Sequence, residues 1–228
     1  MKFGSITTGI ITDGLVLNID AANRASTIPN TSTDKTFNTV DTAISGTFAA
    51  DAQFDSSTTS PSFDFDGTGD HIDFGNPSIL QPSSNYTISI WYYPTSTSST
   101  KAIIGTNINV NSAGGILLTS IGSNLYWYHY SSSSHSVDIG AVTLNQWINI
   151  TATWSTLTGK VLIYQNGVYG GKQITGVNSV TWGSNLYIGK DKAVNNFIGN
   201  VANMQMYNNT LSAPEVLHNY NALKGRFA

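Results

Sequence analysis

The carboxylates are the first residues to examine for chemistry, because paired carboxyl groups are the usual machinery for hydrolysing glycosidic bonds. The chain has a single glutamate, Glu215, which lies in the first turn of a predicted helix. A favourable interaction with the helix dipole is a sufficient structural reason for it. Asp64 and Asp66 are two residues apart and face one side of a predicted strand, so a paired-aspartate site is the alternative. The pattern favours no catalytic pair.

Other catalytic groups are scarce. The absence of cysteine excludes disulfides, thiolate zinc sites and cysteine nucleophiles together. The sequence contains no phosphate-binding glycine loop and no Gly-x-Ser-x-Gly elbow. The chain has four histidines: His71, His129, His135 and His218. Their spacings suit neither a metal-binding pair nor a nucleophile–base pair. We therefore predict that the chain is not an enzyme.

An aromatic segment at 124–130 is the best candidate for binding chemistry. In an extended strand Tyr126, Tyr128 and Tyr130 face one way, and the intervening Leu125, Trp127 and His129 face the other. Exposed aromatic rings stack on sugar faces when neighbouring Asn, Asp or Ser groups bond the hydroxyls.

Trp182 lies in a predicted turn and could extend that aromatic surface, as could Tyr169. We predict a ligand site formed by Tyr126, Tyr128, Tyr130 and Trp182, with a surface glycan as the partner. The alternative is that these rings only fill a thin sandwich, with their polar tips at its edge.

Composition narrows the class of protein. Charged residues make up 10% of the 228, against about 25% in ordinary soluble domains, so Ser, Thr and Asn must wet the surface. That balance is common in proteins that work outside cells. A net charge of −3 argues against nucleic acid as a partner, and no apolar run is long enough for membrane insertion. The first fourteen residues lack a signal peptide, which indicates either a trimmed sequence or release by cell lysis.

Short strands with turn signals between them fill the rest of the sequence. The predicted strands are 15–20, 62–66, 71–74, 86–93, 116–119, 124–130, 147–154, 160–165, 186–189 and 197–207. We expect 62–66 and 71–74 to form a hairpin around Asp66-Gly67, and Asn166-Gly167 to turn a second hairpin. Ser212 to Leu223 is the one predicted helix, with Ser212 as its N-cap. The fold class is therefore all-β, a sandwich of two antiparallel sheets with a short C-terminal helix.

We predict a single domain over 1–228. It has an N-terminal arm at 1–13, a first strand plus a polar, loop-rich segment at 14–61 with one or two short strands, a core at 62–211, and the helix at 212–224.

The order of several motifs resembles the concanavalin A-like jelly roll of laminin-G-like domains. They are Phe65-Asp66-Gly67, Ile88-Ser89-Ile90-Trp91, Asn145-Gln146-Trp147, Thr151-Ala152-Thr153-Trp154, Leu162-Ile163-Tyr164-Gln165-Asn166-Gly167 and Leu186-Tyr187-Ile188-Gly189. The resemblance covers roughly 62–224. It implies no required cofactor but allows one structural Ca²⁺ between edge strands, with Asp20, Asp66 and Asp70 as contributors. Read as an EF-hand, the 64–75 segment fails, because its twelfth position is Gly75.

The two ends of the chain resemble a narrower branch, found in tailed-phage virion proteins. They are Gly14-Leu15-Val16-Leu17-Asn18-Ile19-Asp20-Ala21 and Asn219-Tyr220-Asn221-Ala222-Leu223-Lys224-Gly225-Arg226-Phe227. The branch's Trp-x-Asp-Leu-Ser-Gly-Asn motif is missing, and Lys35-Thr36-Phe37-Asn38 stands near its place.

This resemblance implies a non-enzymatic virion structural protein, such as a capsid decoration protein, at the virion surface. Its partners would be the major capsid protein or tail components, and homo-oligomers are expected because virion positions are symmetric. The alternative is a lectin-like adhesion module, in a tail fibre or a secreted bacterial protein.

Overall fold

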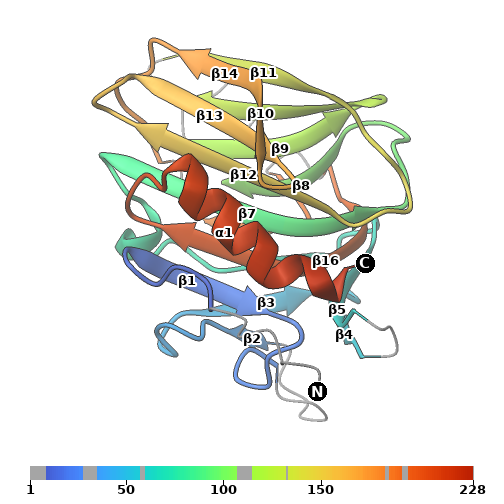
Figure 1. Cartoon of the computed structure of the whole chain (residues 1–228). Coiled ribbons are helices and arrows are strands. Elements are labelled where there is room, and N and C mark those ends of the chain that lie inside the picture. The colour runs from blue at the N-terminus through green and yellow to red at the C-terminus, as the bar shows by residue number, and fades with distance from the viewer. Residues whose placement is uncertain are drawn as a thin grey trace, which may run out of the picture.

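The computed structural model confirms an antiparallel β-sandwich of jelly-roll type with one α-helix on the outside (Figure 1). It describes residues 9–27, 35–56, 60–106, 115–131, 133–182, 185–191 and 195–227. Two sheets pack face to face, and their strands bring distant parts of the sequence together. We call them the helix sheet and the tyrosine sheet.

The helix sheet lies under the C-terminal helix, α1 (Ala213–Leu223). Its strand order is β14 (Val168–Thr175), β13 (Lys160–Gln165), β12 (Ile148–Ser155), β7 (Asn85–Pro94), β16 (Ile198–Tyr207), β5 (Ser62–Asp66) and β4 (Gln53–Asp55), and β1 (Leu15–Asp20) also pairs with β16.

The tyrosine sheet forms the other layer. Its strand order is β11 (Ser134–Ala141), β10 (Asn124–Tyr130), β9 (Gly115–Ile121), β8 (Lys101–Thr106), β15 (Leu186–Ile188), β6 (His71–Asp73), β3 (Ser45–Ala49) and β2 (Lys35–Phe37). Two short 3-10 helices, η1 (Ser78–Leu80) and η2 (Lys224–Arg226), are the remaining elements in the described part of the chain.

The core fills the space between the two inner faces. Across the tyrosine sheet a single register row is apolar and buried: Trp127, Leu118, Ile104, Ile188 and Ile72. On the helix sheet, β7 and β12 contribute every second residue to the same cluster: Tyr86, Ile88, Ile90, Tyr92, Ile148, Ile150, Ala152 and Trp154. The alternation predicted for these strands is confirmed, and it leaves one outer face on each sheet for other chemistry.

The predicted hairpin of 62–66 with 71–74 is wrong. β5 belongs to the helix sheet and β6 to the tyrosine sheet, so the turn between them crosses from one layer to the other. Gly67 and Gly69 take φ of +90° and +91° there, and the Asp70 carboxylate accepts the backbone N–H groups of Asp51 (3.0 Å) and Asp66 (2.8 Å). These bonds hold a corner in which the two strands do not pair.

The polar segment at 14–61 is more structured than predicted. In its described part it holds three short strands after β1, where one or two were expected. β3 pairs with β6 and β4 pairs with β5, so the segment extends both sheets. Of the predicted N-terminal arm at 1–13, residues 1–8 lie outside the described residues, and the backbone of Ile11 bonds to Asn219 and Tyr207 beside α1.

The C-terminal helix begins as predicted, with Ser212 as N-cap. Its apolar side packs Val216 against Tyr164 and Tyr207 of the sheet. On this helix Leu217 is exposed, whereas Asn219 is buried and its amide donates to the Tyr207 hydroxyl. None of the helices in the described part of the chain has the length and apolar character needed to cross a bilayer.

Candidate functional site

The candidate site is the outer face of β10, at one side of the tyrosine sheet. Leu125, Trp127 and His129 point into the core and are almost completely buried. The three tyrosines of the strand therefore point outward, as alternation requires. Tyr126 and Tyr128 are half-buried, whereas Tyr130 is 1% exposed.

The tyrosine rings contact one another along the strand. The centroids of Tyr126 and Tyr128 are 6.3 Å apart with planes tilted by 40°, and those of Tyr128 and Tyr130 are 5.9 Å apart and within 13° of parallel. Leu117 and Ala102 pack beside Tyr130 on the same face. Tyr128 thus rests on a small apolar patch and Tyr126 contacts Tyr128, so both rings are positioned before any ligand arrives.

A polar row runs beside the aromatic row. In register, Asp138 lies opposite Tyr126, Ser136 opposite Tyr128 and Ser134 opposite Tyr130, and all three side chains are exposed on edge strand β11. The Asp138 carboxylate is held by the Asn124 amide and the Gly140 N–H, each at 2.8 Å. We call these two rows, Tyr126, Tyr128, Tyr130, Ser134, Ser136 and Asp138, the tyrosine strip.

The sequence reasoning missed strand β11, although its signal was present. Ser134, Ser136 and Asp138 alternate with His135, Val137 and Ile139, a polar–apolar pattern of period two. Recognising that strand would have placed the polar row next to the tyrosines.

Burial keeps the hydroxyls of Tyr128 and Tyr130 neutral. Burial, and then the neighbouring Tyr126, raise the pKa of Tyr128. Burial also raises the pKa of Tyr130 to about 12, with Tyr128 adding to the effect. Neutral phenols remain both donors and acceptors of hydrogen bonds, which suits a ligand rich in hydroxyl groups.

Trp182 is not brought to the tyrosine strip. Its ring lies edge-on to Tyr86 of the core, with centroids 6.1 Å apart, and its indole N–H donates to the Pro82 carbonyl at 2.9 Å. Tyr86 packs on the inner face of β10, opposite the tyrosines. Tyr169 lies on β14 in the helix sheet. Of the four predicted ligand residues, the structure brings together the three tyrosines.

A buried histidine lies on the inner face of β10, behind the tyrosine strip. His129 lies between the Tyr86 hydroxyl and the Ser179 carbonyl, each 2.9 Å from a ring nitrogen. The carbonyl can only accept, so Nε2 carries the proton and Nδ1 accepts from Tyr86. Burial lowers the pKa of His129 to about 4. The imidazole is therefore a neutral structural link between the two sheets.

The predicted calcium contributors separate into two places. Asp66 and Asp70 share the corner between the sheets, where both Asp70 oxygens accept backbone N–H groups. Asp20 pairs instead with Arg226, at 2.8 Å. Among the described residues no group of three or more acidic or histidine side chains could hold a metal ion.

The candidate catalytic carboxylates have structural partners. Glu215 accepts the N–H and the hydroxyl of Ser212, each at 2.7 Å, and these bonds lower its pKa. Asp64 accepts the Asn200 amide at 3.0 Å on the outer face of β5.

The four histidines lie on four separate elements: β6, β10, β11 and α1. His129 and His135 are register partners, but both ring nitrogens of His129 are already bonded, to Tyr86 and to Ser179.

Comparisons with known proteins agree with the fold. The sequence matches the concanavalin A-like lectin/glucanases superfamily over residues 66–217, about two thirds of the chain. A search of proteins with curated functions finds no match.

Similar solved structures include two of botulinum neurotoxins and one of Paraclostridial Mosquitocidal Protein 1. The first is the binding domain of botulinum neurotoxin DC in complex with SialylT, at TM-score 0.68 and 15% identity over 92% of this chain and 52% of that one. The second is the botulinum neurotoxin type C structure that concerns cell entry through interaction with two ganglioside molecules, at 0.66 and 15% over 92% and 51%. The third is the binding domain of Paraclostridial Mosquitocidal Protein 1, at 0.70 and 16% over 92% and 52%. At such identity they establish the fold alone, and this chain spans about half their length.

Proposed function

The chain belongs to the concanavalin A-like lectin/glucanases superfamily, and from that premise we propose that it is a carbohydrate-binding protein whose ligand lies on the tyrosine strip. One observation carries the proposal. Rings from Tyr126 and Tyr128 lie in register beside exposed polar groups from Ser136 and Asp138.

The chemistry of the strip suits a sugar. An aromatic ring offers its face to the C–H groups of a pyranose, while hydroxyls and a carboxylate bond the hydroxyl rim. The Asp138 carboxylate is already oriented by two hydrogen bonds, so little ordering is needed on binding. A row of rings on β10 with a parallel row of polar groups on β11 fits an extended chain of sugars better than a single residue.

The structural neighbours support the same class of ligand. One is a binding domain in complex with SialylT, and another concerns interaction with two ganglioside molecules. Both are statements about those longer proteins. They make glycans the first ligands to try with this chain.

A glycan array probed with the wild type and with Tyr128→Ala tests the proposal. We expect the wild type to bind a subset of glycans and Tyr128→Ala to lose that signal, because the ring at the centre of the strip is removed. Tyr169→Ala is the matched control, since Tyr169 is also an exposed strand tyrosine but lies on β14. Silence of the wild type on every glycan would contradict the proposal.

We also propose that the chain is not an enzyme. Its single glutamate is engaged in the helix cap, and Asp64 is bonded to Asn200. Glycosidase carboxylates need to flank the scissile bond from two sides, a geometry that neither group provides. The glycans bound on the array should be recovered intact after long incubation with the protein.

A finer proposal concerns the biological setting: a virion-surface protein of a tailed phage, made in the host cytoplasm and released by lysis. The two segments that carry that resemblance meet on the helix sheet, where Asp20 of β1 pairs with Arg226 of η2. They form one structural unit, available to contact a major capsid protein, a tail component or sister subunits. A lectin-like adhesion module of a tail fibre or a secreted bacterial protein is the alternative.

Quantitative mass spectrometry of purified phage particles separates these settings. High copy number favours capsid decoration, a few copies per particle favour a fibre, and absence from particles contradicts the virion proposal. None of these results bears on whether the tyrosine strip binds glycans.

A further inference from the structure

A second row of aromatic and polar side chains crosses the outer face of the helix sheet. In register, Tyr93 of β7 lies opposite Asn200 of β16, and Asn200 lies opposite Asp64 of β5. Their strand neighbours Tyr92, Phe63 and Phe65 fill the core, so these three side chains point outward. All three are half-buried rather than covered.

Trp147 extends this row by a second aromatic ring. Its ring centroid is 5.5 Å from that of Tyr93, and the side chain is half-exposed. The turn that places it is fixed: Asn145 adopts a left-handed φ of 58°, and its N–H donates to the Pro94 carbonyl at 2.8 Å. Two rings are thus held side by side next to an amide and a carboxylate. We call Trp147, Tyr93, Asn200 and Asp64 the tryptophan site.

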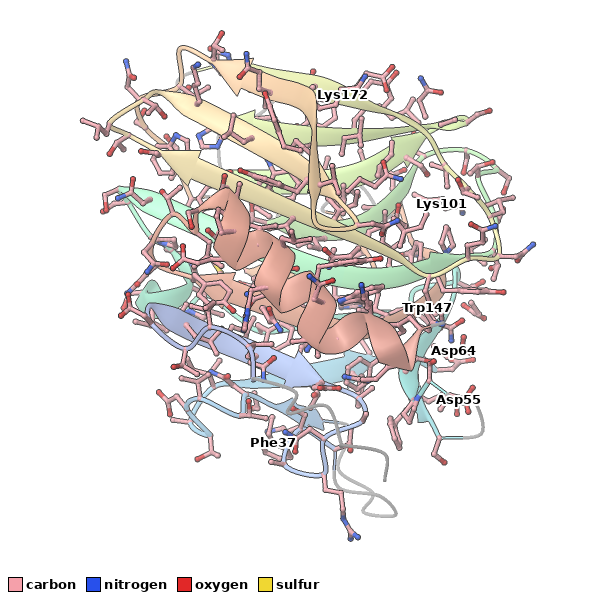
Figure 2. All side chains as sticks on the ribbon, viewed as in Figure 1. Phe37, Asp55, Asp64, Lys101, Trp147 and Lys172 are labelled. Atoms are coloured by element: carbon pink, nitrogen blue, oxygen red, sulfur yellow. The ribbon has the colours of Figure 1, made fainter. Side chains whose placement is uncertain are left out.

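The C-terminal end of the chain forms one wall of the tryptophan site. Figure 2 shows Trp147 and Asp64 on the same side of the molecule, beside the C-terminal end of α1. The ring of Phe227 lies 5.0 Å from that of Trp147 and 4.2 Å from that of Trp91, nearly parallel to the latter. Arg226, next to it, is engaged by Asp20.

The polar half of the site keeps free bonding capacity. The Asn200 amide nitrogen donates to Oδ1 of Asp64 (3.0 Å) and to the Ser62 hydroxyl (3.3 Å). Within the described residues, Oδ2 of Asp64 and Oδ1 of Asn200 accept no hydrogen bond. The two open acceptors lie in one register pair, so they can receive two hydroxyl groups of one ligand.

We infer that the tryptophan site binds an uncharged sugar residue, with its ring against Trp147 and Tyr93 and two of its hydroxyls donating to Asp64 and Asn200. Aromatic rings beside fixed acceptors are the chemistry that recognises a sugar. The neighbouring carboxylates of Asp64 and Asp66 disfavour an anionic sugar, because like charges repel. The site lies on the opposite sheet from the tyrosine strip and does not depend on it. The protein can therefore hold two glycans at once, on its two outer faces.

Saturation-transfer NMR with methyl glycosides tests this site. The probes are methyl glucoside, methyl galactoside, methyl mannoside and, as the anionic comparison, methyl glucuronide, each at millimolar concentration. We expect at least one neutral glycoside to bind the wild type and the glucuronide to bind more weakly. Trp147→Ala should weaken that binding about tenfold, the order expected for loss of an aromatic contact. Asp64→Asn should weaken it because the amide cannot accept as strongly.

Two controls make the outcomes distinct. Trp147→Phe keeps a ring against Phe227, so it should fold like the wild type and retain part of the binding, and Asp64→Asn tests the site even if Trp147→Ala unfolds. Tyr169→Ala, on β14 outside both sites, should leave glycoside binding unchanged, whereas Tyr128→Ala reports any binding at the tyrosine strip. The inference is overturned if no neutral glycoside binds, or if binding survives both Trp147→Ala and Asp64→Asn. Loss with Tyr128→Ala alone would assign all binding to the tyrosine strip and would also overturn it.

Discussion

His129 is the residue whose protonation should matter most for stability. It is fully buried and bonded on both ring nitrogens, and its pKa is lowered to about 4. The unfolded chain takes up this proton near the ordinary histidine pKa of about 6.5. Between these two values the unfolded state binds more protons, so the free energy of unfolding falls as the pH falls.

We therefore predict that stability is highest above about pH 6.5 and declines down to about pH 4. At about 1.4 kcal/mol per pKa unit, the loss from this one group is on the order of 3 kcal/mol. Urea unfolding at a series of pH values measures it. His129→Gln should flatten the slope, whereas His218→Gln, on the outer helix α1 and away from His129, should not. An unchanged slope in His129→Gln would refute this assignment.

Glu215 illustrates a different use of a charged residue. The only glutamate was predicted to have a structural role in the first turn of the helix, and it closes the N-terminus of α1 through Ser212. Its lowered pKa follows from these bonds, not from a cleft. Structural hydrogen bonds perturb pKa values as active sites do, so the lowered pKa of Glu215 does not mark a functional site.

At the scale of elements, the cap of α1 is a testable unit. Ser212→Ala removes the side-chain half of the capping box, and we expect it to lower the free energy of unfolding by about 1 kcal/mol. Ser84→Ala, an exposed serine outside any strand, is the matched control and should be close to neutral. Thermal unfolding of the two variants side by side gives the comparison. Equal stability would mean that the contacts of Val216, Asn219 and Tyr220 with the sheet fix the helix without the cap.

Strand periodicity predicted which residues share a face, but not which face is inside. On β10 the pattern gives two sets, tyrosines and Leu125–Trp127–His129, of similar apolar character. The set containing His129 faces inward because His129 contacts Tyr86 and Trp154 of the opposite sheet, which are distant in sequence. Such a decision depends on packing across the sandwich, which no local pattern contains.

The Gly-containing turns could not be told apart from the sequence either. Asp66-Gly67 and Asn166-Gly167 both supply residues with positive φ, and only the second turns a hairpin. The first crosses between sheets, because β5 pairs with β16 and β6 with β15, more than a hundred residues downstream. The tryptophan site was missed for a related reason. Its residues come from three strands and a turn that only the sheet register brings together.

At the scale of the whole molecule, the sandwich separates its two outer faces into different environments. The helix sheet is partly covered by α1 and η2, and the tyrosine sheet carries the strip near its β11 edge (Figure 1). The connections that pass from one sheet to the other, above all the turn at 67–70, hold the two sheets in a fixed relative position. Asp70 is the residue that holds this corner.

We predict that Asp70→Asn destabilises the protein as much in EDTA as in millimolar calcium, because its carboxylate accepts two backbone N–H groups. Burial raises the pKa of Asp70, with the backbone bonds opposing that effect. Melting temperatures of the wild type and the variant in the two media measure this. A wild type that melts about a degree or more higher in calcium, and a variant that does not, would instead make Asp70 a calcium ligand.

The central claim is that the tyrosine strip binds glycans. The most direct test is titration calorimetry with a glycan selected on the array. It measures the dissociation constants of the wild type and of the double variant Tyr126→Ala/Tyr128→Ala. Loss of two ring contacts, each worth on the order of 1 kcal/mol, predicts a weakening of about tenfold or more, while Tyr169→Ala keeps the wild-type constant. A folded double variant that binds the glycan as tightly as the wild type would contradict the claim.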